Sequence, residues 1–172
     1  MPDDTFDVVF VCTGNQFRSP LAAAVFARET VGLPVRISSC GTGALDGAAA
    51  FEEAAELGTR LSVDLSEHRS RRLGDLAGAD LVVGFEHHHV ERAVVDAEAR
   101  RERAFTLPQL VELLEAHPAS GSPEERLATV RPDNVLEAPE ILDPYGEPSE
   151  VQEAIADEVE DLSRRLAVAL FR

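Results

Sequence analysis

The chain has no lysine and no tryptophan, and its 172 residues include only two cysteines, one methionine and one tyrosine. Two cysteines cannot form a disulfide framework, and no Cys-x-x-Cys or cysteine–histidine spacing suggests a zinc site. No apolar run approaches the roughly 20 residues that cross a membrane, and the N-terminus lacks the basic start and apolar stretch of a signal peptide. We therefore expect a cytoplasmic protein with free thiols and no membrane partner.

Positive charge is also scarce in this chain. Its 16 basic residues are all arginine and are outnumbered by 32 aspartate and glutamate residues, which gives a formal net charge of −16. The long-range field of such a chain repels nucleic acids and anionic membrane surfaces, so we expect neither as a partner. Any site for an anion must then be built locally.

Short apolar runs alternate with segments of helical periodicity along most of the chain. Such alternation predicts an α/β fold, with a doubly wound parallel sheet of four strands and helices on both faces, in one domain over residues 1–172. Residues 117–140 show no clear pattern beyond a loop and a helical turn at 124–129. The predicted strands cover residues 8–11, 35–38, 79–85 and 103–107, and the predicted helices cover 20–27, 48–57, 73–76, 86–99, 110–116 and 149–168.

The first strand runs into the sequence VCTGNQFRSP, residues 11–20, in which Cys12 stands where the apolar run stops. We expect Ser19 to cap the following helix and Pro20 to be its first residue. A loop that leads into a helix N-terminus binds oxyanions, and Gly14 and Asn15 tolerate the left-handed backbone that turns N–H groups inward. Arg18 adds a planar fork of donors, and the same positive surroundings favour the thiolate form of Cys12. The loop therefore predicts a phosphate site that contains a nucleophile.

This loop resembles the signature V-C-x-G-N-x-x-R-S-P of the low-molecular-weight protein tyrosine phosphatase family, and every fixed position of the signature matches. The family also has an Asp-Pro-Tyr near its C-terminus, as at residues 143–145 here, a turn like that at residues 39–42, and a histidine at the place of His68. The resemblance covers nearly the whole chain, with residues 117–140 the poorest match. It implies a flavodoxin-like version of the predicted sheet.

The resemblance implies a role for each matching residue. Cys12 attacks phosphorus to form a phosphocysteine, Asp143 acts as general acid and then as general base, and Ser19 donates to the cysteine sulfur. Phosphate is held by the Arg18 guanidinium together with the backbone N–H groups of the loop. Those N–H groups belong to Thr13, Gly14, Asn15, Gln16, Phe17 and Arg18 itself.

Further roles concern the surroundings of the loop. Tyr145 walls the cleft and stacks on an aromatic leaving group. Asn15, Ser39 and His68 form a network that fixes the loop. The resemblance implies no metal and no other cofactor. The expected partner is a phosphorylated protein, with phosphate or another oxyanion in the loop, and we expect a monomer.

Two loop positions depart from the family pattern. Phe17 replaces a cysteine that commonly forms a reversible disulfide with the nucleophile, which leaves Cys40 as the only alternative redox partner; a small buried residue is the preferred interpretation of Cys40. Gln16 stands where tyrosine phosphatases often have an aliphatic residue and phosphoarginine-specific relatives a threonine. The choice between phosphotyrosine and phosphoarginine therefore stays open.

Other polar groups have simpler interpretations. Residues 87–89 are three consecutive histidines, which point about 100° apart on a helix and so cannot converge on one metal ion. We expect them to be solvated residues of a helix start, with the alternative that one of them lines the rim of the cleft. Arg69, Arg71 and Arg72 suggest a solvated surface. Besides a phosphotyrosine phosphatase, the sequence admits a protein-arginine phosphatase, a thiol-dependent arsenate reductase of the same fold, and a non-catalytic phosphoprotein-binding module. Retention of Cys12 and Asp143 argues against the last of these.

Overall fold

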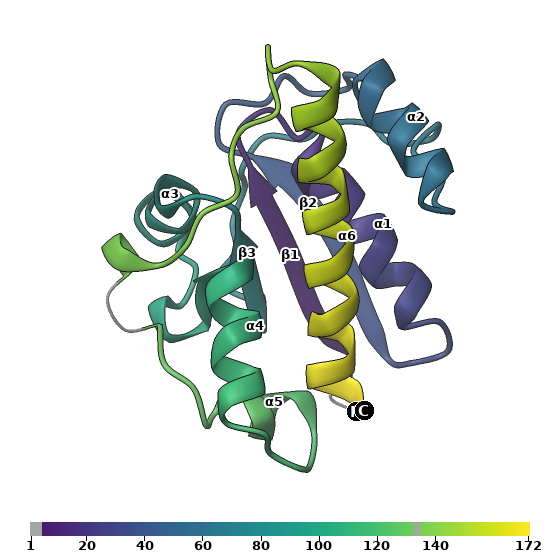
Figure 1. Ribbon diagram of the computed structural model, residues 1–172. Helices are drawn as coiled ribbons and strands as arrows, with labels where there is room; N and C mark the ends of the chain where they lie inside the picture. Colours follow the sequence, from purple (N-terminus) through teal and green to yellow (C-terminus); the bar gives the residue numbers. More distant parts are fainter. Residues whose placement is uncertain (1–4, 133–134) are drawn as a thin grey trace.

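A parallel sheet forms the centre of the protein, for which a computed structural model describes residues 5–132 and 135–172. The strand order is β2-β1-β3-β4, so β1 pairs with β2 on one side and with β3 on the other (Figure 1). The winding direction reverses between β1 and β3, where doubly wound sheets bind their ligands. The four strands are β1 (Phe6–Cys12), β2 (Val35–Gly41), β3 (Leu81–Gly84) and β4 (Ala104–Thr106).

Helices cover both faces of this sheet, as the sequence predicts. Helices α1, α4 and α6 pack over one face, and α3 packs over the other. Among the described residues, no helix combines the length and apolar character needed to cross a membrane. The helices are α1 (Arg18–Glu29), α2 (Glu52–Arg60), α3 (His87–Ala97), α4 (Leu107–Ala116), α5 (Pro123–Leu127) and α6 (Ser149–Phe171), with short 3₁₀ turns at Arg101–Arg103 and Val135–Glu137.

The two faces of β1 explain its continuous apolar sequence. Apolar and polar residues do not alternate over residues 8–11 because both faces are buried. Val8 and Phe10 point into the core under α1 and α6, whereas Val9 and Val11 point into the core under α3. All four side chains are at most 5% exposed. Burial on both sides fixes the register of β1, and with it the position of Cys12 at the end of the strand.

The start of α1 differs from the prediction. The helix begins at Arg18 with Phe17 as its N-cap residue, so Ser19 lies inside the first turn and Pro20 is not the first helical residue. Among the residues that the structure describes, no side chain caps this helix, and the Ser19 hydroxyl contacts the side chains of Cys12 and Asn15 instead. Backbone N–H groups at the helix start thus stay available for a ligand.

Two helix predictions in the middle of the chain differ from the structure: one helix has other ends, and the other is absent. Residues 48–51 precede α2 instead of forming its first turn, because the backbone of Ala48 and Ala49 bonds to Ser70 and to the Gln16 side chain. The helix also passes through Gly58 to Arg60. Residues 73–76 form no helix; the N–H of Leu73 donates to the carbonyl of Gly41, so this segment runs beside the end of β2.

The segment that showed no pattern in the sequence joins the end of the sheet. Helix α5 lies within this segment. The end of the segment, around Pro139, crosses the carboxyl ends of β3 and β4. The hydroxyl of Thr106 donates to the carbonyl of Pro139 at 2.9 Å, and the N–H of Ile141 donates to the carbonyl of Phe85 at 2.8 Å. These bonds carry the chain toward the end of β1, so that Asp143 arrives beside the loop after Cys12.

Candidate active site

The loop after β1 surrounds the sulfur of Cys12 with donors. The N–H of Asn15 points at Sγ from 3.2 Å, and the hydroxyl of Ser19 lies 2.9 Å from it. Asn15 adopts a left-handed backbone with φ of 54°, as the sequence predicts for this position. The thiol is 2% exposed at the floor of the loop. Donors pointing at sulfur stabilise the thiolate over the thiol.

The side-chain amide of Asn15 sets the direction of these bonds. Its Oδ1 accepts from the backbone N–H of Arg71 at 2.9 Å, so its Nδ2 must face the opposite way. From there Nδ2 donates to the hydroxyls of Ser19 at 2.8 Å and Ser39 at 2.9 Å. Because the Ser19 oxygen accepts from Asn15, its own hydrogen is free to point at Cys12. The predicted Asn15–Ser39 contact is present, and Arg71, expected on a solvated surface, also holds this network.

His68 completes the support of the loop, as the resemblance implies. Its Nε2 donates to the carbonyl of Asn15 at 2.6 Å, which fixes the left-handed residue from outside the loop. Burial lowers the pKa of His68 below its usual range, with smaller contributions in the same direction from Arg69 and Arg71. The ring is therefore neutral near pH 7 and donates from Nε2.

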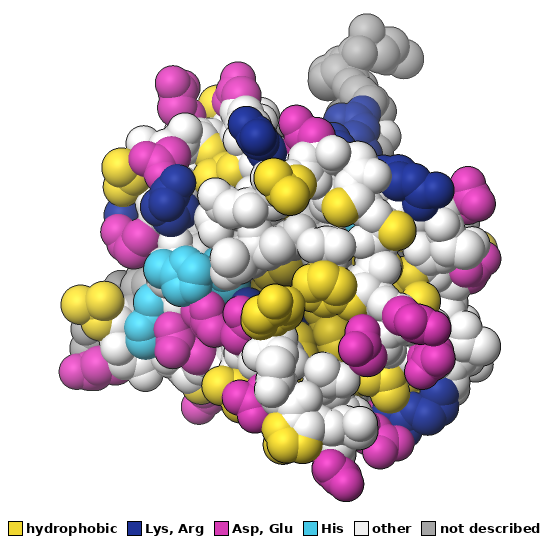
Figure 2. Space-filling model, turned by 90° about the horizontal axis from the view of Figure 1, so that it is seen from above, with side chains coloured by type: hydrophobic (Ala, Val, Ile, Leu, Met, Phe, Trp, Pro, Cys, Tyr) yellow, Lys and Arg dark blue, Asp and Glu magenta, His cyan; other side chains and the backbone are white. Residues whose placement is uncertain are grey.

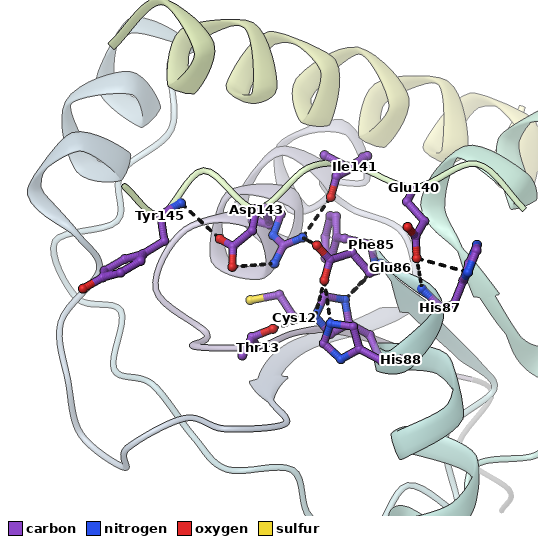
Figure 3. A network of polar contacts seen from close by, with 12 residues as sticks. Cys12, Thr13, Phe85, Glu86, His87, His88, Glu140, Ile141, Asp143 and Tyr145 are labelled. Atoms are coloured by element: carbon purple, nitrogen blue, oxygen red, sulfur yellow. Dashed lines mark hydrogen bonds and ion pairs between the residues drawn. The ribbon is translucent and has the colours of Figure 1, made fainter. Parts of the chain in front are cut away.

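Arg18 is buried beside the loop and is held from several sides. Its Nη1 donates to the carbonyl of Ile141 at 2.9 Å and lies 3.1 Å from a carboxylate oxygen of Glu86. Its Nη2 lies 3.7 Å from Asp143, and its guanidinium stands 5.9 Å from the ring centre of Phe85. Glu86 and Asp143, both drawn in Figure 3, therefore approach different nitrogens of this guanidinium. These contacts fix the plane of the guanidinium.

Asp143 and Tyr145 lie at the mouth of the site. The Asp143 side chain is 48% exposed, and its Oδ1 accepts from the N–H of Tyr145 at 3.1 Å. The Tyr145 ring is exposed and lies 5.9 Å from that of Phe51, centre to centre, so two aromatic rings border one side of the mouth. The structure thus brings together Cys12 and Asp143, which are far apart in the sequence.

The remaining loop positions have distinct surroundings. Thr13 contacts a histidine described below, and an added Cβ on Gly14 would meet only the Gln16 side chain, at 3.8 Å. Gln16 donates from Nε2 to the carbonyl of Ala49 at 2.8 Å, which ties the loop to the segment before α2. Phe17 is 5% exposed and belongs to the hydrophobic core.

Cys40 lies on the other side of the sheet from the nucleophile. It pairs with Val11 across β1 and β2 and packs in the core under α3, whereas Cys12 points into the core under α1. Burial raises the pKa of the Cys40 thiol to about 11. The thiol is therefore protonated at neutral pH and separated from Cys12 by the sheet, which supports the interpretation as a small buried residue.

His89 corrects the expectation that residues 87–89 are solvated. Its ring is fully buried, and its Nδ1 accepts from the backbone N–H groups of Phe85 and Glu86 at 3.2 and 3.0 Å. The proton must then sit on Nε2, which donates to the hydroxyl of Thr13 at 2.9 Å. Burial lowers the pKa of His89 to about 2, and the nearby Arg18 and His88 act in the same direction. His89 is a neutral donor that fixes the first residue of the loop.

Glu86 joins this histidine to Arg18 and was not predicted as a site residue. Its carboxylate contacts Arg18 and also the Nε2 of His88, at 2.5 Å (Figure 3). A signal was present in the sequence: a glutamate directly after a buried strand, three residues before a histidine, resembles a reciprocal cap at a helix start. The side chains of Glu86, His88 and His89 lie close enough to suggest a metal site. The proton on Nε2 of His89 makes this arrangement unsuited to a metal ion.

A thiol that faces donors of the loop after β1, at the switch point of a doubly wound sheet, is also found in enzymes that transfer phosphoryl groups through cysteine. The model of the family described as low molecular weight phosphotyrosine protein phosphatase matches residues 7–125. The chain belongs to this family, and it is a phosphatase.

Among curated relatives, the protein-arginine-phosphatase of Bacillus subtilis is 30% identical over 95% of this chain and 96% of its own length. The low molecular weight protein-tyrosine phosphatase A of Mycobacterium tuberculosis is 33% identical over 59% of this chain and 68% of its own length.

Solved structures show the same fold. A low molecular weight protein tyrosine phosphatase from T. tengcongensis is similar with a TM-score of 0.76 and 30% identity, covering 96% of this chain and 100% of that chain. An arginine phosphatase in which serine replaces cysteine, with a phosphorylated active-site serine, has a TM-score of 0.73 and 29% identity over 95% of this chain and 94% of that chain.

Proposed function

We propose that the protein hydrolyses phosphotyrosine in proteins without a metal ion, through a phosphocysteine on Cys12. One observation carries this proposal: the Cys12 sulfur faces the Ser19 hydroxyl at 2.9 Å and the Asn15 N–H at 3.2 Å, at the floor of a loop built for an oxyanion. The phosphorylated active-site serine in the related arginine phosphatase supports a covalent intermediate at this position.

In the first step, the Cys12 thiolate attacks phosphorus opposite the leaving oxygen. The S–P bond forms as the P–O bond breaks, and the electron pair of that bond goes to the oxygen, which takes a proton from Asp143. The loop N–H groups and the Arg18 guanidinium hold the three equatorial oxygens while charge shifts across them. Ile141 and Glu86 bind Nη1 of Arg18, so the nitrogen that turns to phosphate is Nη2, which lies 3.7 Å from Asp143.

In the second step, water attacks the phosphocysteine and releases inorganic phosphate. Asp143, now ionised, takes the proton from the water, and the S–P electron pair returns to the Cys12 sulfur. The Ser19 hydroxyl donates to this sulfur and so stabilises it as a leaving group. Exposure of the Asp143 side chain to solvent allows water to approach from its side of the cleft.

The aromatic border of the mouth favours phosphotyrosine as the substrate. The exposed Tyr145 ring lies at the entrance beside Asp143, where an aromatic face stacks on the ring of an aryl phosphate. Self-contained arsenate reduction is disfavoured, because Phe17 replaces the loop cysteine and the sheet separates Cys40 from Cys12. Against reduction with an external thiol stands Asp143 in the segment 143–145, which suits hydrolysis. A reducing cytoplasm, as proposed from the cysteine content, keeps the nucleophile in its active form.

Phosphoarginine is the second candidate substrate. Relatives named protein-arginine-phosphatase align over 95% or more of this chain, whereas the tyrosine phosphatase A relatives align over 59%. Gln16 is polar where tyrosine phosphatases often have an aliphatic side chain, and its amide nitrogen is already bonded to Ala49. Its amide oxygen is the remaining hydrogen-bond acceptor for a guanidinium N–H.

The mechanism is tested by turnover of p-nitrophenyl phosphate in the presence of a chelator. We expect the wild type to be active, and Cys12→Ser to be inactive because a serine hydroxyl is a far weaker nucleophile at neutral pH. Asp143→Ala should lower kcat for alkyl or protein phosphates by about 10²–10⁴-fold, the range for general acid catalysis, and less for the p-nitrophenyl ester, whose leaving group needs no proton. Full activity of Cys12→Ser would contradict the mechanism.

The substrate is tested by comparing kcat/KM for phosphotyrosine and phosphoarginine forms of one peptide. The proposal expects higher kcat/KM for the phosphotyrosine form. Gln16→Leu discriminates further: it should leave phosphotyrosine hydrolysis within about twofold but lower phosphoarginine hydrolysis about tenfold, because an acceptor for the guanidinium is lost. Faster turnover of the phosphoarginine peptide by the wild type would establish the second candidate instead.

A further inference from the structure

A hollow of about 250 Å³ lies beside the phosphate-binding loop, where three segments meet. The loop contributes Phe17, the start of α2 contributes Phe51 and Glu53, and the acid-bearing loop contributes residues 144–147, with Gln152 of α6 below. Because Cys12, Arg18 and Asp143 do not line it, this flanking hollow is not the place of the phosphoryl group. Tyr145 joins the two places, since its ring lines the hollow and its N–H bonds to Asp143.

The flanking hollow combines aromatic faces with carboxylates. The rings of Phe51 and Tyr145 lie 5.9 Å apart with an angle of 36° between their planes, and Tyr145 is 76% exposed. Within the described residues, neither Glu53 nor Glu147 forms an ion pair, unlike Glu153 of α6, which pairs with Arg60. Ring faces and unpaired carboxylates at one place attract a cation.

The surrounding surface has the same character. Figure 2, which looks down on the carboxyl ends of the strands, shows hydrophobic side chains in the middle of this face and acidic side chains on both sides of them. With a net charge of −16, the protein as a whole repels an acidic phosphopeptide. A basic group in the substrate, next to the phosphate, offsets that repulsion.

We propose that the flanking hollow is a subsite for a lysine or arginine side chain close in sequence to the phosphorylated residue. This inference rests on the proposed function, and it applies to phosphotyrosine and phosphoarginine substrates alike. Pockets for drug-sized ligands measure about 300–1,000 Å³, so a hollow of this size suits one side chain. The methylene stem of the basic residue lies along Tyr145 and Phe51, and its charged head reaches Glu53 and Glu147.

The test uses three sets of phosphopeptides that differ only at the four positions flanking the phosphorylated residue, which carry arginine, norleucine or glutamate. Two enzyme variants are compared with the wild type. One combines Glu53→Gln and Glu147→Gln; its matched control combines Glu56→Gln and Glu150→Gln, which removes the same charge from exposed positions of α2 and α6 outside the hollow. Affinities of Cys12→Ser for the same peptides give a second readout that needs no turnover.

For the wild type we expect kcat/KM about tenfold higher for arginine than for glutamate peptides, the combined effect of two exposed ion pairs and one cation–π contact. The subsite variant should reduce this ratio to about threefold or less, while the control variant keeps it. Binding to Cys12→Ser should follow the same order, and high salt should weaken it.

Three results would overturn the subsite. These are equal use of all peptides by the wild type, a preference for norleucine over arginine, and an equal loss of preference in the control variant, which would assign the effect to the overall field. If the enzyme hydrolyses no phosphate ester but Cys12→Ser still prefers the arginine peptides, the proposed function fails and the subsite stands.

Discussion

The amide of Asn15 connects most of the polar groups around the nucleophile. It accepts from Arg71 and donates to Ser19 and Ser39, while the backbone carbonyl of the same residue accepts from His68. Within the described part of the chain, the one side chain of this network that bonds to sulfur is Ser19, which contacts Cys12. The two serines therefore differ in function although both accept from one amide.

Replacing these serines separates a catalytic from a supporting contribution. Ser19→Ala removes a donor to charged sulfur, an interaction of about 1.5–3 kcal/mol, so we expect kcat to fall about tenfold to a hundredfold. Ser39→Ala leaves the Ser19 hydroxyl as a donor to Cys12, so kcat should fall by less than about fivefold. Steady-state kinetics with p-nitrophenyl phosphate measure both. Equal losses in the two variants would show that Ser19 acts only through the network.

His89 makes the stability of the fold depend on pH. Its pKa is about 2 in the folded protein, and the ordinary value of about 6.5 applies to the unfolded chain. Below pH 6.5 the unfolded state binds a proton that the folded state does not, so the stability is full above pH 6.5 and falls as the pH falls toward 2. Between pH 7 and pH 5, protonation of this one group in the unfolded chain lowers the free energy of unfolding by about 2 kcal/mol. The figure holds for any pKa of folded His89 well below 5.

We therefore expect His89→Asn to lose about 2 kcal/mol less free energy of unfolding than the wild type between pH 7 and pH 5. Urea denaturation at the two pH values measures the difference. His88→Asn, which changes the exposed neighbour, is the control and should follow the wild type. Identical pH dependence in the wild type and His89→Asn would contradict the buried, neutral state of His89.

At the scale of elements, the end of β2 supports the loop after β1. The Cβ of an alanine at Gly41 would lie 2.4 Å from the carbonyl oxygen of Thr13 and 2.9 Å from the backbone nitrogen of Asn15. Real Cβ atoms do not approach backbone this closely, so the loop and strand would have to move apart. Gly43, two residues on, has only contacts of 3.7 Å or more and tolerates a methyl group.

Gly41→Ala should therefore lower both stability and turnover. Overpacking of this kind costs about 1–3 kcal/mol, and displacement of the loop N–H groups should reduce kcat at least tenfold. Gly43→Ala should change kcat by less than about twofold. Thermal unfolding and p-nitrophenyl phosphate turnover are measured side by side. A fully active Gly41→Ala enzyme would mean that the loop does not depend on its contact with β2.

The elements also show where sequence reasoning succeeds and fails. The strands were predicted within a few residues, since buried parallel strands have a continuous apolar sequence that a short window detects. The start of α2 is not predicted correctly, because the backbone of Ala48 and Ala49 bonds to Ser70 and Gln16, which are distant in sequence. Ser19 was assigned as a cap from its neighbours alone, while its hydroxyl is bound by the side chains of Cys12 and Asn15.

At the scale of the whole molecule, the sheet separates the two thiols. Cys12 and Cys40 point into cores on opposite faces, and Phe17 stands where a loop cysteine would be. Peroxide should therefore inactivate the enzyme by oxidation of Cys12 without forming a Cys12–Cys40 disulfide.

Intact mass and non-reducing peptide maps test this expectation. Cys40→Ala should be inactivated by peroxide at the wild-type rate, within about twofold, and treatment with a thiol should reduce the sulfenic form back to the thiol in both enzymes. A mass loss of about 2 Da together with a Cys12–Cys40 peptide would contradict the separation of the thiols.

The one-domain organisation of residues 1–172 stays a prediction of the sequence.

Neighbouring residues and a family motif are enough to predict the alternating α/β pattern, a phosphate loop with a nucleophilic thiol, and Asp143 as the candidate acid. The packing of the chain, in contrast, is what shows that Glu86 and Asp143 border Arg18, that His89 is buried against Thr13, and that Cys40 lies across the sheet from Cys12. These facts join segments far apart along the chain. Their proximity follows from how the strands and helices pack, which no local pattern records.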